Sequence, residues 1–401
     1  MLVRRLKCMA IFTLFVFGFC EWFIYYIVLY QCSWPKLSPE KPTDAKGALR
    51  VMMLADTHLL GPIDGHWFDK LRREWQMRRT FQTALTLFRP EAVFVLGDLF
   101  DEGMTCSDEE FEDYFARFNR LFYHPDDIEF HVVFGNHDIG FHDRASQDDL
   151  KLYQRFKRAF NIPPAQLLRI KGNLFVFVNS IGLEGDSCSM CNETVSALYN
   201  IASRLHCDRN HQKRTVLDDG VLGKLRFDKI LECEIPRNSP APILIQHYPL
   251  YRPNEADCIG PDAPPPDKRT ETNRPRWEVV SQEASSFLLS TLQPRLVVSG
   301  HTHHGCYLVH EGGIPELTIP SFSWRNRNNP SFILAVITPE NYVLGKCFMP
   351  EESTVIYIYI FSGLVLLIMN LSIAITGLRR FIRRCRRQMY RQELQGVATR
   401  Y

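Results

Sequence analysis

The amino-acid sequence predicts an α/β protein with a membrane-spanning helix near each end. Two observations indicate the α/β fold: short apolar runs typical of buried strands alternate with longer helical patterns, and several of these runs stop at Asp, Asn or His. A third observation indicates the membrane helices. An apolar run long enough to cross a bilayer lies near each terminus, with basic residues beside it.

The composition excludes few classes of protein by itself. The chain has 401 residues, of which 45% are hydrophobic, and this length suits one large domain or two ordinary ones. Lys and Arg total 47 against 45 Asp and Glu, so the formal net charge is +2 and no nucleic-acid footprint is present. The basic residues instead cluster at the two ends, beside the apolar runs.

The first membrane helix is predicted at residues 8–30, after a basic cytoplasmic segment at 1–7. A cleaved signal peptide also has a basic start and an apolar stretch. We favour an uncleaved anchor, because the apolar run continues through Trp22–Val28 and no small-x-small site follows it cleanly. Glu21 is costly in lipid, so we expect it to face a partner helix or to reach the membrane surface.

The second membrane helix is predicted at residues 354–378 and is followed by a basic tail at 379–401. Basic residues favour the cytoplasmic side, so both termini are expected there. Residues 32–353 then lie together on the lumenal side. Within them, 31–48 are rich in Pro and Lys and are expected to form a stalk, and 49–347 are expected to form the folded domain.

Cysteine usage and a sequon agree with an oxidising lumen. Asn192 begins an Asn-Glu-Thr tripeptide, the acceptor pattern for N-glycosylation. Cys188-x-x-Cys191 suggests a zinc site or a redox pair, but the second such pair of a zinc ribbon is absent. We therefore favour disulfides, whose pairing the sequence leaves open, among nine cysteines between the spans: Cys32, Cys106, Cys188, Cys191, Cys207, Cys233, Cys258, Cys306 and Cys347.

Apolar runs with β-branched or aromatic residues predict strands, and longer segments between them predict helices. Strands are expected at Leu49–Ala55, Val93–Leu96, Phe130–Phe134, Leu174–Ile181, Pro242–His247 and Pro294–Ser299. Helices are expected at Trp67–Phe88, which Pro90 closes, at Glu109–Phe122, near residue 230 and at Trp277–Leu292. Ser187–Asp219 is expected to be an insertion or a surface helix and loop, and Asp257–Pro275 a loop over the site. A second sheet is expected to finish with short strands near Leu317–Pro320, Phe332–Ile337 and Tyr342–Cys347.

Polar residues follow five of the predicted strands, and strand ends at one edge of a sheet can converge in space. Gly97, after the second strand, allows a sharp turn before Asp98. Oxygen and imidazole donors suit Mn, Fe or Zn, and so many ligands fit two ions that share a bridging carboxylate better than one. The candidate ligands are Asp56, His58, Asp98, Asn136, His247, His301 and His303.

Each of these residues has an ordinary structural interpretation. Asp98 alone is more often a turn or helix-cap residue, and His247 alone is more often a packed core histidine. All five strand ends together, in this order, favour a metal site. His142, His304 and His310 are expected at the surface or behind the ligands. Packing is the expected role of the aromatic residues near the site: Trp67, Phe68, Tyr248, Tyr251, Phe322 and Trp324.

These blocks resemble the signature of the calcineurin-like metallophosphoesterases: Asp56-x-His58, Gly97-Asp98-x-x-Asp101, Gly135-Asn136-His137-Asp138, His247 and Gly300-His301-x-His303. The resemblance covers roughly residues 49–347 and implies a β-α-α-β sandwich. It implies one ion held by Asp56, His58, Asp98 and His303, and another by Asp98, Asn136, His247 and His301. It places His137 near the leaving group, with Asp138 behind it to orient the ring. Asp101 is expected to hold the loop or a neighbouring histidine.

The two membrane helices narrow the resemblance to members that remodel glycosylphosphatidylinositol (GPI) anchors early in the secretory pathway. That resemblance implies removal of the ethanolamine-phosphate branch from the second mannose, with Mn as the metal and GPI-anchored proteins as substrates. It implies transport from the endoplasmic reticulum to the Golgi, residence at exit sites, the intermediate compartment and the cis-Golgi, and a link to p24-type cargo receptors. The alternatives are a lumenal phosphatase or nucleotide phosphodiesterase, and a non-catalytic cargo adaptor.

Overall fold

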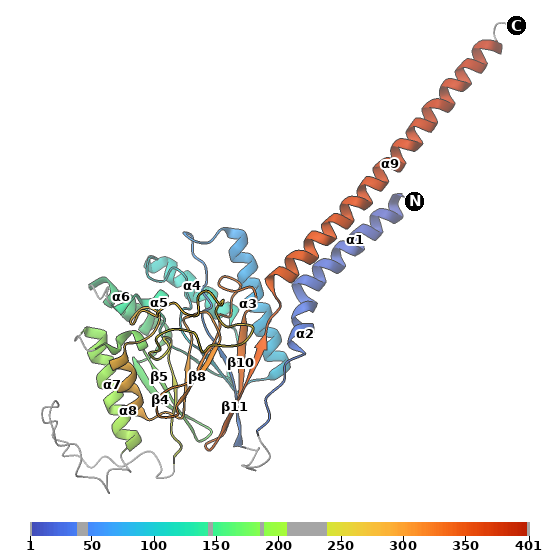
Figure 1. The fold of residues 1–401 in the computed structure, drawn as a ribbon. Helices are drawn as coiled ribbons and strands as arrows, with labels where there is room; N and C mark the ends of the chain where they lie inside the picture. The colour runs from blue at the N-terminus through green and yellow to red at the C-terminus, as the bar shows by residue number, and fades with distance from the viewer. Residues whose placement is uncertain (1, 38–46, 143–146, 185–187, 207–238, 399–401) are drawn as a thin grey trace, which may run out of the picture. The chain divides into compact units, whose positions relative to one another are not determined.

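A computed structural model of the chain describes residues 2–37, 47–142, 147–184, 188–206 and 239–398. The chain divides into two compact units, Val28–Met349 and the pair of terminal segments Met1–Ile27 and Pro350–Tyr401. The larger unit contains two β-sheets with helices on their outer sides (Figure 1). The expected α/β architecture is therefore present.

The first sheet has five strands and carries the first three strand ends that bear candidate ligands. β1 pairs in parallel with β2, and β2 pairs in parallel with β3. β10 pairs antiparallel with both β1 and β11, which closes the other side of the sheet. From edge to edge the order is β11 (Tyr342–Phe348), β10 (Ser331–Ile337), β1 (Leu49–Leu54), β2 (Ala92–Val95) and β3 (Glu129–Val132).

The second sheet has six strands and carries the later candidate ligands. Its central strands β5, β6, β7 and β9 run parallel, with β4 antiparallel at one edge and β8 at the other. The order is β4 (Ala165–Ile170), β5 (Asn173–Val178), β6 (Ile243–Ile245), β7 (Leu296–Ser299), β9 (Pro315–Thr318) and β8 (Cys306–Val309). Parallel strands end at a common edge, so the ends of β6 and β7 are adjacent.

The two sheets pack face to face over one apolar core. Phe94 of β2 makes edge-on contacts with Phe175 and Phe177 of β5, with ring centroids 5.2 and 4.9 Å apart. All three rings are buried, and burying a phenylalanine stabilises a fold by about 1.5–3 kcal/mol. This core fixes the strand ends of both sheets relative to one another.

Helices lie outside the sandwich. α3 (Trp67–Phe88) packs with α4 (Asp108–Leu121), and α7 (Ser189–His206) packs with α8 (Gln282–Leu292) (Figure 1). α6 (Gln147–Phe160) contacts α7 and the short helix α5 (Asn136–Ile139). The start of α4 is fixed by a capping box, in which Ser107 and Glu110 each accept a hydrogen bond from the other's backbone N–H.

Two sequence predictions about this unit are corrected, and two strands were missed. The last two strands, β10 and β11, join the first sheet rather than finish the second. The helix expected from Trp277 begins at Gln282, because the Ser281 hydroxyl caps it by accepting from the N–H of Ala284. Strands β4 and β8 were not predicted. The helix near residue 230, and the part of the insertion beyond α7, lie outside the described residues.

Three disulfides join described cysteines: Cys32–Cys347, Cys188–Cys191 and Cys258–Cys306. Cys106 carries a free, buried thiol, and Cys207 and Cys233 lie outside the described residues. The first disulfide ties the start of the expected stalk to β11, and the indole N–H of Trp34 donates to the carbonyl of Phe88. Residues near Cys32 are thus part of the folded unit.

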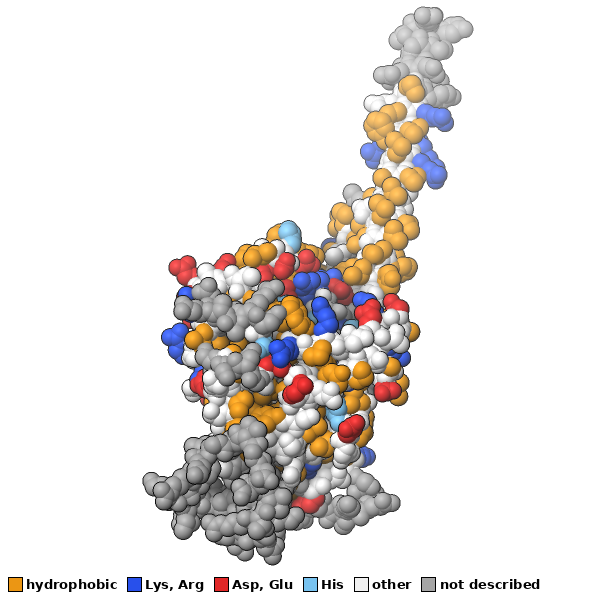
Figure 2. Space-filling model, turned by 60° about the vertical axis from the view of Figure 1, so that its left-hand side comes forward, with side chains coloured by type: hydrophobic (Ala, Val, Ile, Leu, Met, Phe, Trp, Pro, Cys, Tyr) orange, Lys and Arg blue, Asp and Glu red, His pale blue; other side chains and the backbone are white. Residues whose placement is uncertain are grey.

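The terminal unit consists of two helical segments that are apolar and long enough to cross a membrane, Val3–Leu29 and Glu352–Met389. The first comprises α1 (Leu2–Gly18), a π-helical turn η1 (Phe19–Phe23) and α2 (Ile24–Leu29), and the second lies in α9 (Glu352–Ala398). Apolar side chains cover much of α9, and arginines follow toward its C-terminal end (Figure 2). The Tyr359 hydroxyl donates to the carboxylate of Glu21, so Glu21 faces a partner helix, one of the two expected outcomes.

Candidate metal centre

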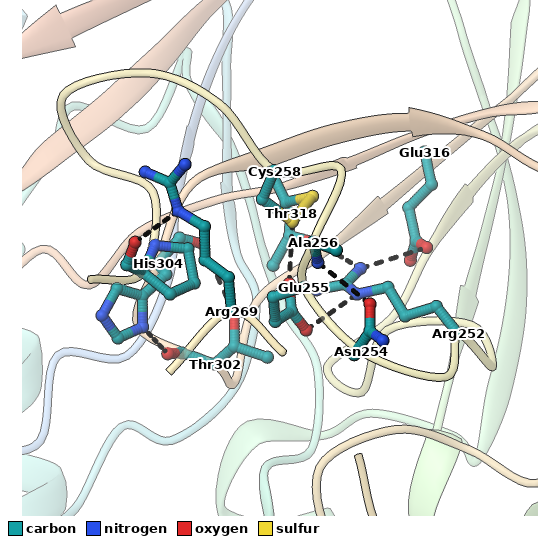
Figure 3. Close-up of a disulfide and its surroundings, with 12 residues drawn as sticks. Arg252, Asn254, Glu255, Ala256, Cys258, Arg269, Thr302, His304, Glu316 and Thr318 are labelled. Carbon is teal, nitrogen blue, oxygen red and sulfur yellow. Dashed lines mark hydrogen bonds and ion pairs between the residues drawn. A yellow bond between two sulfur atoms is a disulfide. The ribbon is translucent and has the colours of Figure 1, made fainter. Parts of the chain in front are cut away.

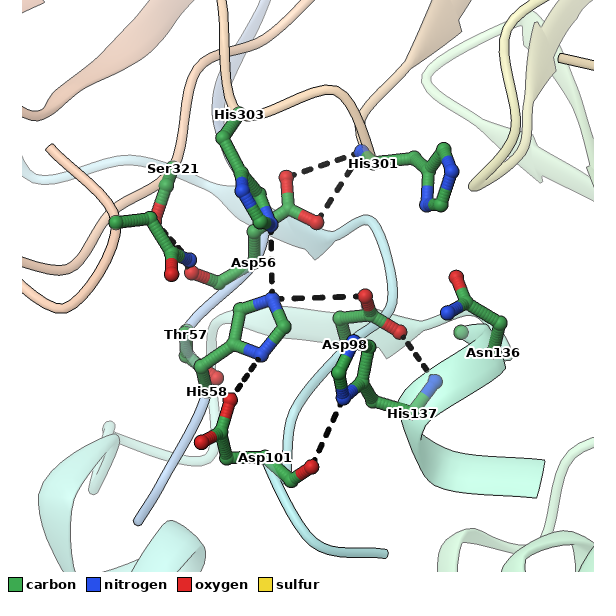
Figure 4. A network of polar contacts seen from close by, with 12 residues as sticks. Asp56, Thr57, His58, Asp98, Asp101, Asn136, His137, His301, His303 and Ser321 are labelled. Atoms are coloured by element: carbon green, nitrogen blue, oxygen red, sulfur yellow. Dashed lines mark hydrogen bonds and ion pairs between the residues drawn. The ribbon is translucent and has the colours of Figure 1, made fainter. Parts of the chain in front are cut away.

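The structure brings all seven candidate ligands together where the strands of both sheets end. Figure 4 shows these ligands except His247, which it does not label. The first sheet supplies Asp56 and His58 after β1, Asp98 after β2, and Asn136 at the start of α5, which follows β3. The second sheet supplies the rest from segments after β6 and β7: His247, His301 and His303. The aspartates, Asn136, His58 and His247 are each at most 2% exposed. Convergence at the strand ends therefore matches the sequence prediction.

The backbone at five of these positions is left-handed. The φ angles lie between 42° and 74° at Asp56, His58, Asp98, His301 and His303. This conformation costs a residue other than glycine about 1–2 kcal/mol. Such strained positions concentrate at functional sites, where the surrounding structure holds them.

Two glycines let neighbouring atoms approach Asp98 closely: Gly97 precedes it in the chain, and Gly135 lies beside it in space. Gly97 has a φ of 82°, and a Cβ atom there would lie 2.6 Å from Nδ1 of His247. A Cβ atom on Gly135 would lie 2.0 Å from the backbone nitrogen of Asp98. The sharp turn and close approach expected of Gly97 are both present.

One ligand group contains Asp56, His58, Asp98 and His303, whose donor atoms all lie within 4.8 Å of one another. Nε2 of His58 is 3.0 Å from Nε2 of His303 and 3.5 Å from Oδ2 of Asp98. This is the set expected for one of the two ions.

A second group contains Asp98, His247 and His301, again within 4.8 Å. Nε2 of His247 lies 3.3 Å from Oδ1 of Asp98, 3.0 Å from Oδ1 of Asn136 and 3.2 Å from Nδ1 of His301. Asp98 belongs to both groups and offers one oxygen to each. That is the geometry a bridging carboxylate requires.

Three histidines are oriented by a hydrogen bond on the ring nitrogen that faces away from the centre. Nδ1 of His58 donates to Oδ1 of Asp101 at 2.9 Å, as expected for Asp101. Nδ1 of His247 donates to the carbonyl of Leu96 at 2.7 Å, and Nε2 of His301 donates to the carbonyl of Trp277 at 2.5 Å. A carbonyl can only accept, so the outer nitrogens of His247 and His301 carry hydrogen. Such bonds fix metal-binding histidines in the required tautomer.

This arrangement fits cations. Metal binding requires both inward nitrogens, of His247 and His301, to be unprotonated acceptors; they lie 3.2 Å apart, and a cation between the donors would relieve their repulsion. Oδ2 of Asp98 is a buried acceptor with no hydrogen-bond partner. Groups of this kind call for a compensating ligand. A mixed carboxylate, amide and imidazole set suits divalent metal ions.

The electrostatics also favour positive charge beside Asp98. Burial alone would raise the pKa of Asp98, but the imidazoles of His247 and His137 hold that pKa well below its usual range. Burial alone would lower the pKa of His247, but the Asp98 and Asp56 carboxylates raise it to about 9. Metal binding would displace the proton that these carboxylates attract.

The structure corrects the role expected of Asp138. Its carboxylate accepts from the backbone N–H groups of Leu99, Phe100 and Gly135, at 3.0 to 3.1 Å. The ring of His137 is oriented instead by the carbonyl of Asp101, which accepts from Nδ1 at 2.8 Å. Asp138 therefore joins the turn after β2 to the turn after β3, and it acts on the backbone that carries Asp98.

Sequence reasoning missed two side chains that hold the centre. Arg325 donates to Oδ2 of Asp101 at 3.2 Å, so Asp101 links this arginine to His58. Ser321 donates to the carbonyl of Asp56 at 2.7 Å. Both lie in the segment after β9, where no motif marks them. The Trp277 carbonyl was also missed, because a backbone group leaves no signal in the sequence.

The first part of the loop after β6 is held by a buried polar network around the Cys258–Cys306 disulfide (Figure 3). Arg252 binds Glu255 through two hydrogen bonds of 2.9 Å and lies 3.6 Å from the carboxylate of Glu316. This network holds the loop after β6 against β8 and β9. The beginning of the loop that was expected over the site is thus fixed to the second sheet.

Most of the other residues that the sequence placed near the site have structural roles. His142, His304 and His310 are bound to Ile181, Thr302 and Glu316, respectively, rather than placed among the ligands. Tyr248, Phe322 and Trp324 are buried, as expected for packing, and Tyr251 is half-buried. Trp67 and Phe68 are instead more than half exposed, at 67% and 53%.

Two facing sheets with this centre at their strand ends define a metal-dependent phosphoesterase. The chain belongs to the calcineurin-like phosphoesterase family, whose model matches residues 49–305. It is similar to three proteins named Metallophosphoesterase 1. The Mus musculus protein is 48% identical over 346 residues, covering 85% of this chain and 82% of the relative. The Gallus gallus protein is 47% identical over 364 residues, covering 88% of this chain and 86% of the relative. The Danio rerio protein is 45% identical over 358 residues, covering 89% of this chain and 88% of the relative.

Proposed function

We propose that this chain is a dinuclear-metal phosphodiesterase that removes the ethanolamine-phosphate branch from the second mannose of GPI anchors. Its action would promote transport of GPI-anchored proteins from the endoplasmic reticulum to the Golgi. The observation that carries the proposal is a complete family ligand set in a chain that also has two candidate membrane spans.

The ligand set supports catalysis rather than a purely structural role. The two groups share Asp98, and every ligand position that the family pattern requires is filled. A bound pair of divalent ions supplies charge neutralisation for the phosphate oxygens and lowers the pKa of an attacking water. Mn is the proposed metal. A non-catalytic adaptor has no need for a buried, strained and fully assembled ligand set.

His137 is placed to move a proton. Its Nδ1 donates to the carbonyl of Asp101, which leaves Nε2 as the nitrogen that can exchange a proton with substrate. Its backbone N–H donates to Oδ1 of Asp98 at 2.8 Å, so the residue is fixed relative to the bridging carboxylate. We assign His137 as the general acid that protonates the leaving alkoxide, a step worth about 10²–10⁴ in rate.

The membrane tether supports a lipid-anchored substrate. Residues 31–48 and 348–353 separate the expected spans from the expected domain, and Cys32 within the first segment is already cross-linked to Cys347 of β11. An extended chain covers at most about 3.6 Å per residue. The domain is thereby confined near a bilayer, where an anchored substrate has a high effective concentration. With both termini cytoplasmic, the domain would be lumenal, at endoplasmic reticulum exit sites, the intermediate compartment and the cis-Golgi. A p24-type cargo receptor is the proposed partner.

Mass spectrometry of GPI glycans tests the proposal. Cells that lack the protein should retain ethanolamine phosphate on the second mannose, and the wild-type chain should restore its removal. Asp98→Asn should not restore it, whereas Asp108→Asn, at an exposed carboxylate in α4, should restore it fully.

The outcomes separate the alternatives. An unchanged glycan in deficient cells, together with metal-dependent hydrolysis of nucleotides or simple phosphoesters, would indicate a phosphatase or nucleotide phosphodiesterase. Restored transport by Asp98→Asn would indicate an adaptor. Either result rejects the proposed reaction.

A further inference from the structure

The Cys188–Cys191 disulfide lies at the amino end of α7, away from the proposed ligands. Cys188 immediately precedes the helix, and its carbonyl accepts the first helical hydrogen bond, from the N–H of Asn192 at 3.0 Å. Cys188 is partly exposed, whereas Cys191 is 2% exposed. Cys188 is therefore the more accessible of the two cysteines, and Cys191 is the protected one.

The protein stabilises negative charge on the accessible sulfur. The backbone N–H of Cys191 points at Sγ of Cys188, with a nitrogen–sulfur distance of 3.1 Å. The amino end of a helix carries partial positive charge from its free N–H groups, and α7 has 18 residues. Both effects lower the free energy of a thiolate at Cys188, and such surroundings are typical of reactive cysteines.

A buried histidine lies beside the protected sulfur. His142 is 3% exposed, and its Nδ1 lies 3.2 Å from the carbonyl of Ile181 and 3.5 Å from Sγ of Cys191. The carbonyl can only accept, so Nδ1 carries hydrogen. The same N–H can donate to a thiolate that leaves at Cys191.

The Cys258–Cys306 disulfide provides an internal contrast. Both of its cysteines are at most 2% exposed, and Sγ of Cys258 lies 2.9 Å from a carboxylate oxygen of Glu255, where a thiolate is disfavoured. It joins residues 48 apart, and Cys32–Cys347 joins residues 315 apart, whereas Cys188–Cys191 spans 3. Cross-links over long segments constrain the unfolded chain more. Among the three disulfides between described cysteines, Cys188–Cys191 is therefore the one whose opening costs the fold least.

We propose that Cys188–Cys191 is a redox-active disulfide that exchanges with small thiols of the glutathione class. A glutathione thiolate attacks Sγ of Cys188, the bond between the two cysteine sulfurs breaks, and Cys191 leaves as a thiolate beside the His142 N–H. A second glutathione thiolate attacks the sulfur of the bound glutathione and releases the Cys188 thiolate. Glutathione is oxidised to its disulfide, Cys188 and Cys191 are reduced to thiols, and the two protons from glutathione end on those thiols.

Equilibrium in graded glutathione buffers tests the proposal on the full-length chain in detergent. After acid quenching and differential alkylation, mass spectrometry reports the reduced fraction of each pair. Cys188–Cys191 should reach half-reduction at a ratio of reduced to oxidised glutathione at least about tenfold lower than Cys258–Cys306. Reduction of both pairs over the same range, or of Cys188–Cys191 last, overturns the proposal.

Single variants test the assignment of the two sulfurs. In Cys191→Ser, oxidised glutathione should trap a mixed disulfide at Cys188, and in Cys188→Ser the modification of Cys191 should be at least about tenfold slower. His142→Leu should slow reduction of the wild-type pair, whereas His124→Leu, at a histidine stacked on Phe130, should not. Equal modification of the two cysteine variants overturns the assignment, and the buffer titration, which uses no variant, remains decisive if a variant misfolds.

Discussion

Replacing Asp101 with Asn isolates the hydrogen bond that orients His58. Both partners of Asp101 are donors: His58 Nδ1 lies 2.9 Å from one carboxylate oxygen, and Arg325 lies 3.2 Å from the other. An amide has only one oxygen, so its NH₂ group must face one of these donors. The change keeps the side-chain volume but removes either the bond that fixes the His58 tautomer or the contact with Arg325.

The expected magnitude follows from the role of such a partner. Loss of a group that orients a metal-binding histidine typically costs 10- to 100-fold in affinity or activity, which is about 1.4–2.7 kcal/mol. We expect this loss for the ion bound by Asp56, His58, Asp98 and His303, with a smaller effect on the other ion. Arg325→Gln should change affinity less, because it leaves the bond between Asp101 and His58 in place.

Manganese titration of the metal-free protein measures this effect, by calorimetry and by hydrolysis of bis(4-nitrophenyl) phosphate at graded metal concentrations. The metal dependence of Asp101→Asn should shift to higher concentration by the factor above. Asp113→Asn is the matched control, since that carboxylate is 65% exposed and pairs with Arg117. An Asp101→Asn protein with wild-type metal dependence would refute the role assigned to Asp101.

Three further predictions follow from the same centre. His137→Ala should keep both ions and lose about 10²–10⁴ in rate on alkyl esters but far less on 4-nitrophenyl esters, and metal loss on elemental analysis would instead make His137 a ligand or support. Gly97→Ala should abolish turnover, because its Cβ would lie 2.6 Å from Nδ1 of His247; wild-type activity would contradict the close approach. Chelation should lower the melting temperature of the wild-type chain, since ions bind only the folded centre, and less in Asp98→Ala; equal shifts would place the stabilising metal elsewhere.

Sequence patterns located the strand ends that supply the ligands more reliably than they located whole sheets. The ligand positions follow from short apolar runs and the polar residues after them, which are local signals. Pairing of β10 with β1 joins residues almost three hundred positions apart, and no local pattern specifies it. The same is true of the disulfide between Cys32 and Cys347. The start of α8 could have been found, because Ser281 is a residue type that favours helix caps.

The two interpretations of Asp98, turn residue or ligand, prove compatible. Its φ angle of 49° shows that it does form the turn after β2, and its two oxygens face the two ligand groups. Among residues other than glycine, Asn, Asp and His are the types enriched in left-handed backbone, and the same side chains donate oxygen or nitrogen to metals. One choice of residue thus meets the demands of the backbone and of the metal. Asn at position 98 keeps the turn and removes the charge, whereas Ala removes both, so the difference between the two variants measures how much of the function depends on the carboxylate itself.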